Sequence, residues 1–293
     1  MIVDATLLLN AVASGLLLGC LYAIAASGLA VSFGLLDIVN IAHPAFMVAA
    51  AFLIAWLFDA TGYDPLMLAC AIAPAFGLAG AALYRLYHFF FERRGDRSIQ
   101  GLAFFFGLMF VVEVSLLLVF GADQQWVSAS YSTGAISIGS VDLPLRMLVP
   151  AAVSLAALGG LLVFLKLTFL GRAIAAVAQD QEALRLMGVN PVRVKAVAFA
   201  ISLSLAALAG GALVVAEPVD TTSGQIFVGR LFAIVIMGGV GSLSGSFIAA
   251  LLFGLIENLT ATLLGPSWSP AVAFGLLLGF LALRPRGLLG AAA

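Results

Sequence analysis

Eight long apolar stretches dominate the sequence and exclude most folds other than a bundle of membrane helices. They cover residues 7–33, 44–58, 65–84, 99–120, 144–165, 196–216, 230–264 and 268–283. About 20 helical residues cross the hydrocarbon core of a bilayer. Runs such as GLLLGCLYAIAASGLAV do not alternate apolar and polar residues, as the strands of a membrane β-barrel would. We therefore predict an all-α polytopic membrane protein with about eight transmembrane helices.

The composition excludes a protein whose main solvent is water. Of the 293 residues, 63% are hydrophobic and 9% are charged, whereas soluble domains carry about 25% charged residues. The net charge of −1 gives no basic field for nucleic acid. Cys20 and Cys70 lie in apolar runs, and neither a disulfide framework nor a metal site follows from them. Only Asp4 precedes the first run, so we expect a retained membrane helix there and not a signal peptide.

The basic residues predict which connections face the cytoplasm. Eleven of the 13 Lys and Arg residues fall in three regions, which the positive-inside rule places on the cytoplasmic side. The other connections are acidic or nearly uncharged and are expected outside. The basic residues of the three regions are Arg85, Arg93, Arg94 and Arg97, then Lys166, Arg172, Arg185, Arg193 and Lys195, and finally Arg284 and Arg286.

Two apolar stretches are predicted to be broken or re-entrant, near residues 34–43 and 238–245. Asp37, Asn40 and His43 interrupt the first of them. The second lies within residues 230–264, which start outside and must also end outside if the tail is cytoplasmic. A helix of this length would measure about 52 Å, which is too short for two full crossings of about 30 Å each. Paired broken segments are typical of transporters built from repeats. The orientation of the N-terminus stays open. The residues of the second break are Gly238, Gly239, Gly241, Ser242 and Gly245.

The connection of residues 171–195 is too long for a turn and too apolar for a flexible linker. We predict a helix in which Gly188 supplies a left-handed cap and Pro191 a stop. This helix either lies on the inner leaflet or docks a cytoplasmic partner, and Asp180 and Glu182 argue against an anionic lipid surface. Its predicted apolar face consists of Ile174, Val177, Ala178, Gln181 and Leu184.

Three motifs together resemble the permease subunit of a binding-protein-dependent ABC importer of the branched-chain amino acid (Liv) type. The first motif resembles the family's cytoplasmic EAA-like motif and comprises Asp180, Glu182, Ala183, Gly188, Asn190 and Arg193. The second is the run Asn40-Ile41-Ala42-His43. It is followed by Pro44 and Ala45, where the family most often has glycine and then a polar residue. The third is the glycine-rich run 238–245, with Glu257 further on and the tail Arg284-Pro285-Arg286-Gly287-Leu288.

The resemblance implies a single transmembrane permease domain over residues 1–293, in the inner membrane of the cell. Its partners would be two cytoplasmic ATPase subunits, a second and different permease chain, an extracytoplasmic solute-binding protein and the lipid bilayer. The chain lacks the phosphate-binding motif G-x-x-x-x-G-K-[ST], so ATP and magnesium would bind to the ATPase subunits. Residues 171–195, here named the coupling loop, would contact them through Glu182 and Arg193. Leucine, isoleucine and valine are the expected solutes, with urea, amides or aromatic acids as alternatives.

Four polar residues within the apolar stretches or at the first break are candidates for the translocation pathway: Asn40, His43, Glu113 and Glu257. Ionisable residues inside a membrane are costly and are functional hypotheses by default. The alternative is structural, because a polar side chain can satisfy backbone groups freed by a helix break. A self-sufficient secondary transporter or channel that uses Glu113 or Glu257 as a proton or ion site is the alternative function. We predict no catalytic site, metal site or enzyme activity.

The aromatic residues that follow residue 83 are interpreted as an interfacial belt. Tyr84, Tyr87 and His88 stand beside residues 89–91, which are all phenylalanine, and before Glu92. Aromatic side chains gather at the level of the lipid headgroups, and a ligand or catalytic role for His88 is not expected.

Overall fold

The structure, a computed structural model, describes residues 5–36, 38–94, 98–284 and 287–289. Within these residues, eight helical segments are long and apolar enough to cross a membrane. The predicted all-α polytopic membrane protein with about eight transmembrane helices is therefore confirmed. Five residues used in the sequence analysis lie outside the described residues: Asp4, Asp37, Arg97, Pro285 and Arg286.

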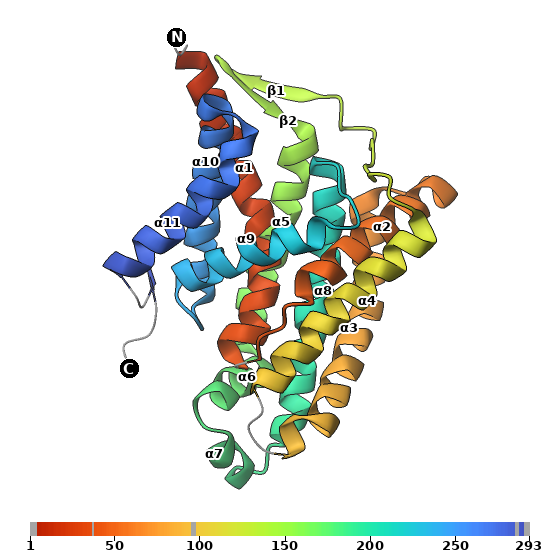
Figure 1. Cartoon of the computed structure of the whole chain (residues 1–293), viewed down its shortest axis with the longest axis vertical. Helices are drawn as coiled ribbons and strands as arrows, with labels where there is room; N and C mark the ends of the chain where they lie inside the picture. Colours follow the sequence, from red (N-terminus) through yellow and green to blue (C-terminus); the bar gives the residue numbers. More distant parts are fainter. Residues whose placement is uncertain (1–4, 37, 95–97, 285–286, 290–293) are drawn as a thin grey trace.

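The elements follow one another as helices with one short hairpin (Figure 1). The antiparallel strands β1 (Ala135–Ile138) and β2 (Val141–Pro144) lie between α4 and α5, and the sequence analysis did not predict them. The helices are α1 (Ala5–Leu29), the π-helix η1 (Ala30–Leu35), α2 (His43–Thr61), α3 (Pro65–Phe90), the 3-10 helix η2 (Glu92–Arg94), α4 (Ser98–Phe120), α5 (Leu145–Leu167), α6 (Phe169–Gln179), α7 (Gln181–Leu186), α8 (Pro191–Ala216), α9 (Ser223–Gly238), α10 (Leu243–Leu264), the 3-10 helix η3 (Pro266–Trp268) and α11 (Ser269–Leu283).

Local chemistry explains where the helices begin and end, as the junction of α2 and α3 illustrates. Gly62 ends α2 with φ of 71°, a left-handed conformation that costs glycine little. The Asp64 carboxylate then caps α3 by accepting hydrogen bonds from the amides of Leu66 and Met67 at 2.9 and 3.3 Å. Pro65 occupies the first turn of α3, where its missing N–H is not needed.

The N-terminus of α1 lies at the same end of the molecule as the β1–β2 hairpin (Figure 1). The Asn10 side chain accepts a hydrogen bond from the amide of Asp142 at 2.7 Å and joins the two. The helices α6 and α7 lie at the opposite end, together with the end of α3. Because that opposite end carries two basic connections, the positive-inside rule predicts that it faces the cytoplasm and that α1 begins outside.

Both predicted breaks are present, and they touch each other. The first separates η1 from α2, and the second separates α9 from α10. A Cβ atom on Gly34 would lie 2.6 Å from the amide nitrogen of Gly241, so the two breaks pack backbone to backbone. The second break is narrower than predicted, because Ser242 caps α10 through the amide of Gly245 at 3.1 Å. Gly245 therefore belongs to the first turn of α10.

The chain end returns to the second break. The amides of Leu288 and Leu289 donate hydrogen bonds to the carbonyl oxygens of Met237 and Gly238, at 2.8 and 3.1 Å. These bonds satisfy carbonyl groups at the end of α9, a 16-residue helix. Two parts of the motif that resembled an importer permease are thus brought into contact.

The helix α8 forms the centre of the bundle and packs against α1, α2, α3 and α5. In the most apolar part of α8, 72% of the residues are buried, compared with 6% in the segment Pro266–Leu283, which contains α11. Glycines allow this close packing: a Cβ atom on Gly80 would lie 2.5 Å from the carbonyl oxygen of Phe199. In contrast, Gly275 and Gly279 on α11 face open space.

Replacing Gly254 by valine is expected to destabilise the contact between α1 and α10. A Cβ atom on Gly254 would lie 2.4 Å from the amide nitrogen of Gly19, so the backbones would have to separate. Overpacking of this kind costs about 1–3 kcal/mol. Thermal unfolding in detergent measures the effect. Gly275→Val is the matched control, since it adds the same side chain to a site with free space. Equal unfolding temperatures for the two variants would contradict the α1–α10 contact.

Candidate functional site

The coupling loop folds into two helices, α6 and α7, and not into the single helix predicted from its apolar face. Asp180 separates them with an extended backbone (φ −154°). Its carboxylate caps α7 by accepting hydrogen bonds from the amides of Glu182 and Ala183, at 2.8 and 3.0 Å. Of the predicted face, Ile174, Val177 and Leu184 are buried, while Ala178 and Gln181 are exposed. The prediction of one helix was wrong because Asp180 starts a new one.

The exit from α7 is a left-handed turn at Gly188, as predicted. Gly188 has φ of 78°, and its amide donates a hydrogen bond to the carbonyl of Arg185 at 2.9 Å. The amide of the next residue, Val189, donates to the carbonyl of Leu184 at 3.2 Å. Together these bonds close the C-terminus of α7.

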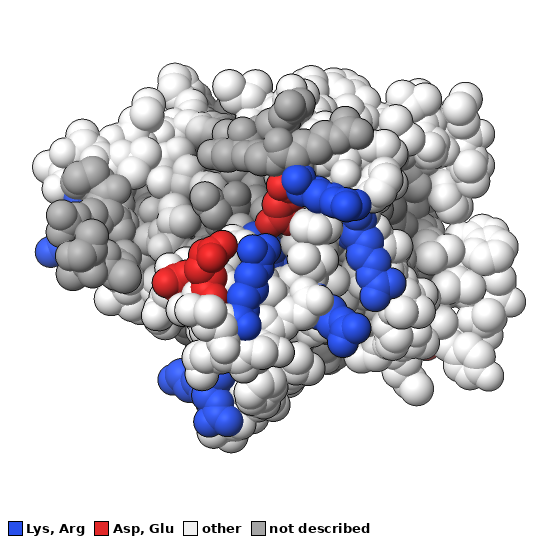
Figure 2. Space-filling model, turned by 90° about the horizontal axis from the view of Figure 1, so that it is seen from below, with Lys and Arg blue, Asp and Glu red and all other residues white. Residues whose placement is uncertain are grey.

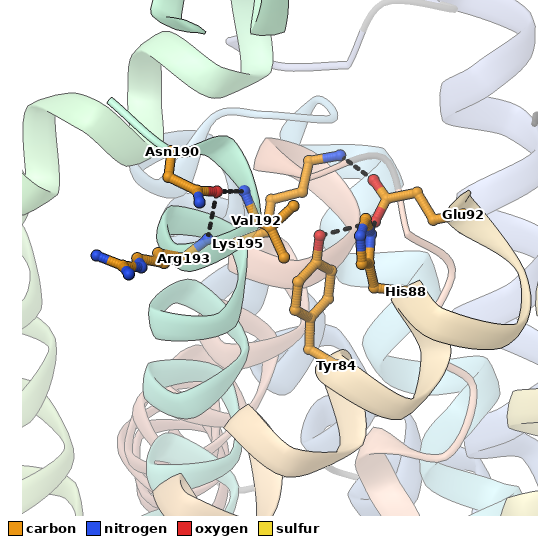
Figure 3. Close-up of polar contacts among 7 residues, drawn as sticks. All are labelled: Tyr84, His88, Glu92, Asn190, Val192, Arg193 and Lys195. Carbon is orange, nitrogen blue, oxygen red and sulfur yellow. Dashed lines mark hydrogen bonds and ion pairs between the residues drawn. The ribbon is translucent and has the colours of Figure 1, made fainter. Parts of the chain in front are cut away.

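The helix α8 begins directly after this exit. The side-chain oxygen of Asn190 accepts hydrogen bonds from the amides of Val192 and Arg193, at 3.0 and 3.4 Å, and caps the helix (Figure 3). Pro191 stands at the first position of α8. It therefore starts a helix, although the sequence suggested that it acts as a stop.

Apolar side chains form the tip of α7. Leu186 is 90% exposed and Met187 is 79% exposed. Beside them, the side chains of Arg185 and Glu182 pair at 3.4 Å on the exposed surface, a contact that contributes little stability. Figure 2, which views the molecule from below, shows that Lys and Arg side chains gather on this end face.

Four side chains join the end of α3 to the start of α8, and we name them the Glu92 cluster: Tyr84, His88, Glu92 and Lys195. The Glu92 carboxylate interacts with the Tyr84 hydroxyl at 2.7 Å, with His88 Nδ1 at 2.8 Å and with the Lys195 ammonium group at 2.5 Å (Figure 3). Lys195 is buried, and Glu92 is 25% exposed. The cluster holds α8 next to α3 at the C-terminal end of the coupling loop.

The donors of the Glu92 cluster stabilise the ionised carboxylate. Burial alone would raise the pKa of Glu92, but hydrogen bonds from Lys195, Tyr84 and His88 outweigh it and hold the pKa below its ordinary value of 4.5. A carboxylate with a lowered pKa stabilises the fold above its unfolded-state pKa. That stabilisation is lost as the pH falls through the lower, folded-state pKa.

We expect Glu92→Gln to lower the free energy of unfolding at pH 7 by about 1–3 kcal/mol, because Lys195 loses its charged partner. The difference from wild type should shrink as the pH falls below 4.5, since protonation removes the same charge from Glu92. Chemical denaturation in detergent across this pH range measures it. Glu182→Gln is the control, because it breaks only an exposed pair. A difference for Glu92→Gln that stays constant with pH would contradict the role of the charge.

At the first break, His43 is buried, and both nitrogens of its ring lie within hydrogen-bonding distance of neighbouring groups. Its Nε2 atom lies 3.2 Å from the carbonyl oxygen of Ala25, and its Nδ1 atom lies 3.3 Å from the hydroxyl of Ser202. The Ser202 hydroxyl also lies 2.7 Å from the carbonyl oxygen of Gly28. Asn40 is equally buried, but neither atom of its amide group has a partner among the described residues.

The two candidate glutamates are both held by α9. Glu113 on α4 accepts a hydrogen bond from the side-chain Nε2 of Gln225 at 2.8 Å. Glu257 on α10 pairs with the guanidinium group of Arg230 at 2.7 Å. The Arg230 guanidinium also lies over the ring of Tyr22, 5.9 Å from its centroid. The structure therefore gives the two glutamates different partners, Gln225 and Arg230, while Asn40 and His43 both lie at the first break.

Several contacts of this region were not predicted. The sequence analysis missed Arg230 as the partner of the Glu257 carboxylate and Tyr22 as the ring beside Arg230. It also interpreted Tyr84 and His88 as an interfacial belt. Two signals were available: Tyr84, His88 and Glu92 are spaced four residues apart, which aligns side chains on one helix face, and Arg230 lies outside the basic connections. In the described parts of the chain, no group of three His, Cys, Asp or Glu residues could hold a metal ion.

Comparisons with known proteins identify the family. The family described as "Branched-chain amino acid transport system / permease component" matches residues 11–281. This chain belongs to that family. The permease resembles the high-affinity branched-chain amino acid transport system permease protein BraD of Pseudomonas aeruginosa, with 28% identity over 96% of this chain and 95% of BraD. It resembles LivH of Escherichia coli K12 with 27% identity over 94% of each chain.

A second kind of permease protein matches part of this chain. LivM of Escherichia coli K12, also a high-affinity branched-chain amino acid transport system permease protein, is 33% identical over 122 residues, which cover 41% of this permease and 28% of LivM. No solved structure matches the permease. Because the relatives are permease proteins of transport systems, the permease is a transport subunit and not an enzyme.

Proposed function

We propose that this permease is one of two membrane subunits of an ATP-driven importer that carries branched-chain amino acids into the cytoplasm. The α6–α7 segment, which lies at the basic end of the molecule with an exposed apolar tip, carries the proposal. A channel or secondary transporter needs no such element. ATP and magnesium would bind to two separate ATPase subunits that dock there, and this chain would hold no cofactor.

The capping residues support this docking role, because they fix the shape of the segment. Asp180 starts α7, Gly188 ends it, and Asn190 starts α8. Force applied to α7 would pass to α8, which the Glu92 cluster joins to α3. At membrane depth, the Ser202 hydroxyl of α8 lies against His43 at the first break. A continuous packed path thus connects the coupling loop with the broken helices.

Family membership and the relatives' names support the remaining partners. LivM, which this chain matches in part, is a permease of the same kind of system, and we propose a related but different chain as the second membrane subunit. The exposed helix α11, with glycines facing open space, suits close contact with another helix or with lipid. A solute-binding protein would dock at the end that carries the β1–β2 hairpin. The proposed location is the inner membrane.

The candidate pathway residues differ in how well their contacts suit a transport role. His43 bonds to backbone at the break, which supports a structural role. Asn40, Glu113 and Glu257 each retain a buried side-chain atom without a partner among the described residues. We propose Asn40 and Glu113, which carry no ion pair there, as groups that the solute or water contacts. The ion pair with Arg230 disfavours Glu257 as a free proton site.

Uptake of labelled leucine into reconstituted vesicles tests the proposal. The vesicles contain this permease, the candidate second permease, the two ATPase subunits and the binding protein. We expect uptake that requires ATP and every one of these components. Leucine flux through this chain alone, driven by a proton or ion gradient, would overturn the proposal and favour a secondary transporter or channel.

A further inference from the structure

A hollow at the outer end of the molecule has the size and chemistry of a small-molecule site. It lies between the α4–α5 connection, the start of α5 and the end of α8, and its volume is about 490 Å³. Ligand pockets commonly have volumes of about 300–1,000 Å³ and are mostly apolar with a few polar groups. Here Trp126, Val127 and Val215 provide apolar walls, and Arg146 and Glu217 provide opposite charges.

Backbone pairing fixes the walls of this hollow. Gln125 and Val219 exchange two backbone hydrogen bonds, of 2.8 and 2.9 Å. The amide of Val127 donates to the carbonyl of Val214 at 3.0 Å. The α4–α5 connection is therefore held against the end of α8, and the lining residues are positioned before any solute arrives.

Glu217 links the hollow to the buried ion pair beneath it. Its Oε1 atom is buried and has no hydrogen-bond partner among the described residues. The Glu217 carboxyl group also interacts electrostatically with Arg230 and Glu257. Burial raises the pKa of Glu217, so a cation bound beside it would stabilise the ionised carboxylate. A cation is the ligand that such an arrangement favours.

The distribution of basic residues points to the same place. Of the 13 Lys and Arg residues in the chain, only Arg146 and Arg230 lie outside the three basic regions. Arg146 lines the hollow, and Arg230 interacts electrostatically with Glu217, which also lines it. Both exceptions to the charge pattern of the membrane protein are therefore linked to the hollow.

We propose that this hollow binds the head group of a zwitterionic, apolar amino acid on its way into the membrane. Glu217 accepts hydrogen bonds from the α-ammonium group, and Arg146 donates to the α-carboxylate. The walls formed by Trp126 and Val127 contact the apolar side chain. The inference rests on the proposed function, because it assumes that the solute is an amino acid.

Leucine binding to the assembled importer, without its solute-binding protein, tests the site. We expect saturable binding of labelled leucine to wild type and binding about tenfold weaker to Glu217→Gln. Asp123→Asn is the matched control, since it removes an acidic charge from the α4–α5 connection, which borders the hollow, at a position that does not line it. 4-Methylpentanoate, which lacks the ammonium group, should compete equally well at wild type and Glu217→Gln.

A second variant keeps the test decisive if Glu217→Gln does not fold. Arg146 is exposed, and Arg146→Gln should weaken leucine binding but not the binding of leucinamide, which lacks the carboxylate. Wild-type leucine affinity in both variants would overturn the site. So would the absence of saturable binding to a wild-type importer that transports leucine. ATP-dependent uptake would in both cases leave the proposed function standing, whereas its absence in wild type would refute that function.

Discussion

Gly188→Val is expected to reduce ATP-dependent leucine uptake about tenfold or more, while the permease still assembles in the membrane. Gly188 adopts φ of 78° with open space around it. A left-handed conformation costs an ordinary residue about 1–2 kcal/mol, and a β-branched residue tolerates it least. Valine would therefore shift α7 away from the position in which it docks. A shift of about 1.4 kcal/mol in that equilibrium changes the docked population tenfold.

Gly188→Asn is the matched control for this prediction. Asparagine enters the left-handed region more readily than other residues with a side chain, and the space around Gly188 accepts it. Uptake by Gly188→Asn should stay close to wild type. If both variants transport normally, the shape of the α7 exit does not matter for coupling, and the proposed role of the coupling loop fails.

Met187→Asp is expected to weaken binding of the ATPase subunits by about 2 kcal/mol or more, the size of an interface hot spot. Met187 is 79% exposed at the tip of α7 and supports no part of the permease core. A flexible apolar side chain in this position suits a partner surface. Affinity between the purified permease pair and the ATPase subunits measures the loss.

Arg185→Ala is the control for the tip of α7. Arg185 lies close to Met187 in the chain, is exposed and pairs with Glu182 among the described residues, so its removal should change affinity by less than about 1 kcal/mol. Equal affinities for Met187→Asp and wild type, with intact folding, would show that the apolar tip contacts lipid and not a protein partner.

The sequence predicted those features that depend on local chemistry or on the bilayer. Span length, the positions of the two breaks and the glycine exit at Gly188 all follow from neighbouring residues. The basic connections also follow, since the membrane itself sorts charge. The helix break at Asp180 was missed because the apolar spacing continues across it, and a side-chain cap outweighed that spacing.

Contacts between distant segments could not be predicted. Glu92 and Lys195 are 103 positions apart, and nothing near either residue indicates the other. The same holds for the hydrogen bond between Asn10 and Asp142, 132 positions apart, which joins α1 to the hairpin. Such pairs form only when the helices pack, so the local sequence around one partner does not indicate the other.

Cross-linking from the tip of α7 tests the central claim, that the coupling loop docks an ATPase subunit, most directly. Met187→Cys would be introduced into a chain in which Cys20 and Cys70 are replaced by alanine, and the assembled, active importer would be treated with a short thiol–amine cross-linker. We expect a covalent adduct with the mass of this permease plus one ATPase subunit. Ser137→Cys on the outer hairpin should give no such adduct. Absence of the Met187→Cys adduct from an importer that transports leucine would contradict the account.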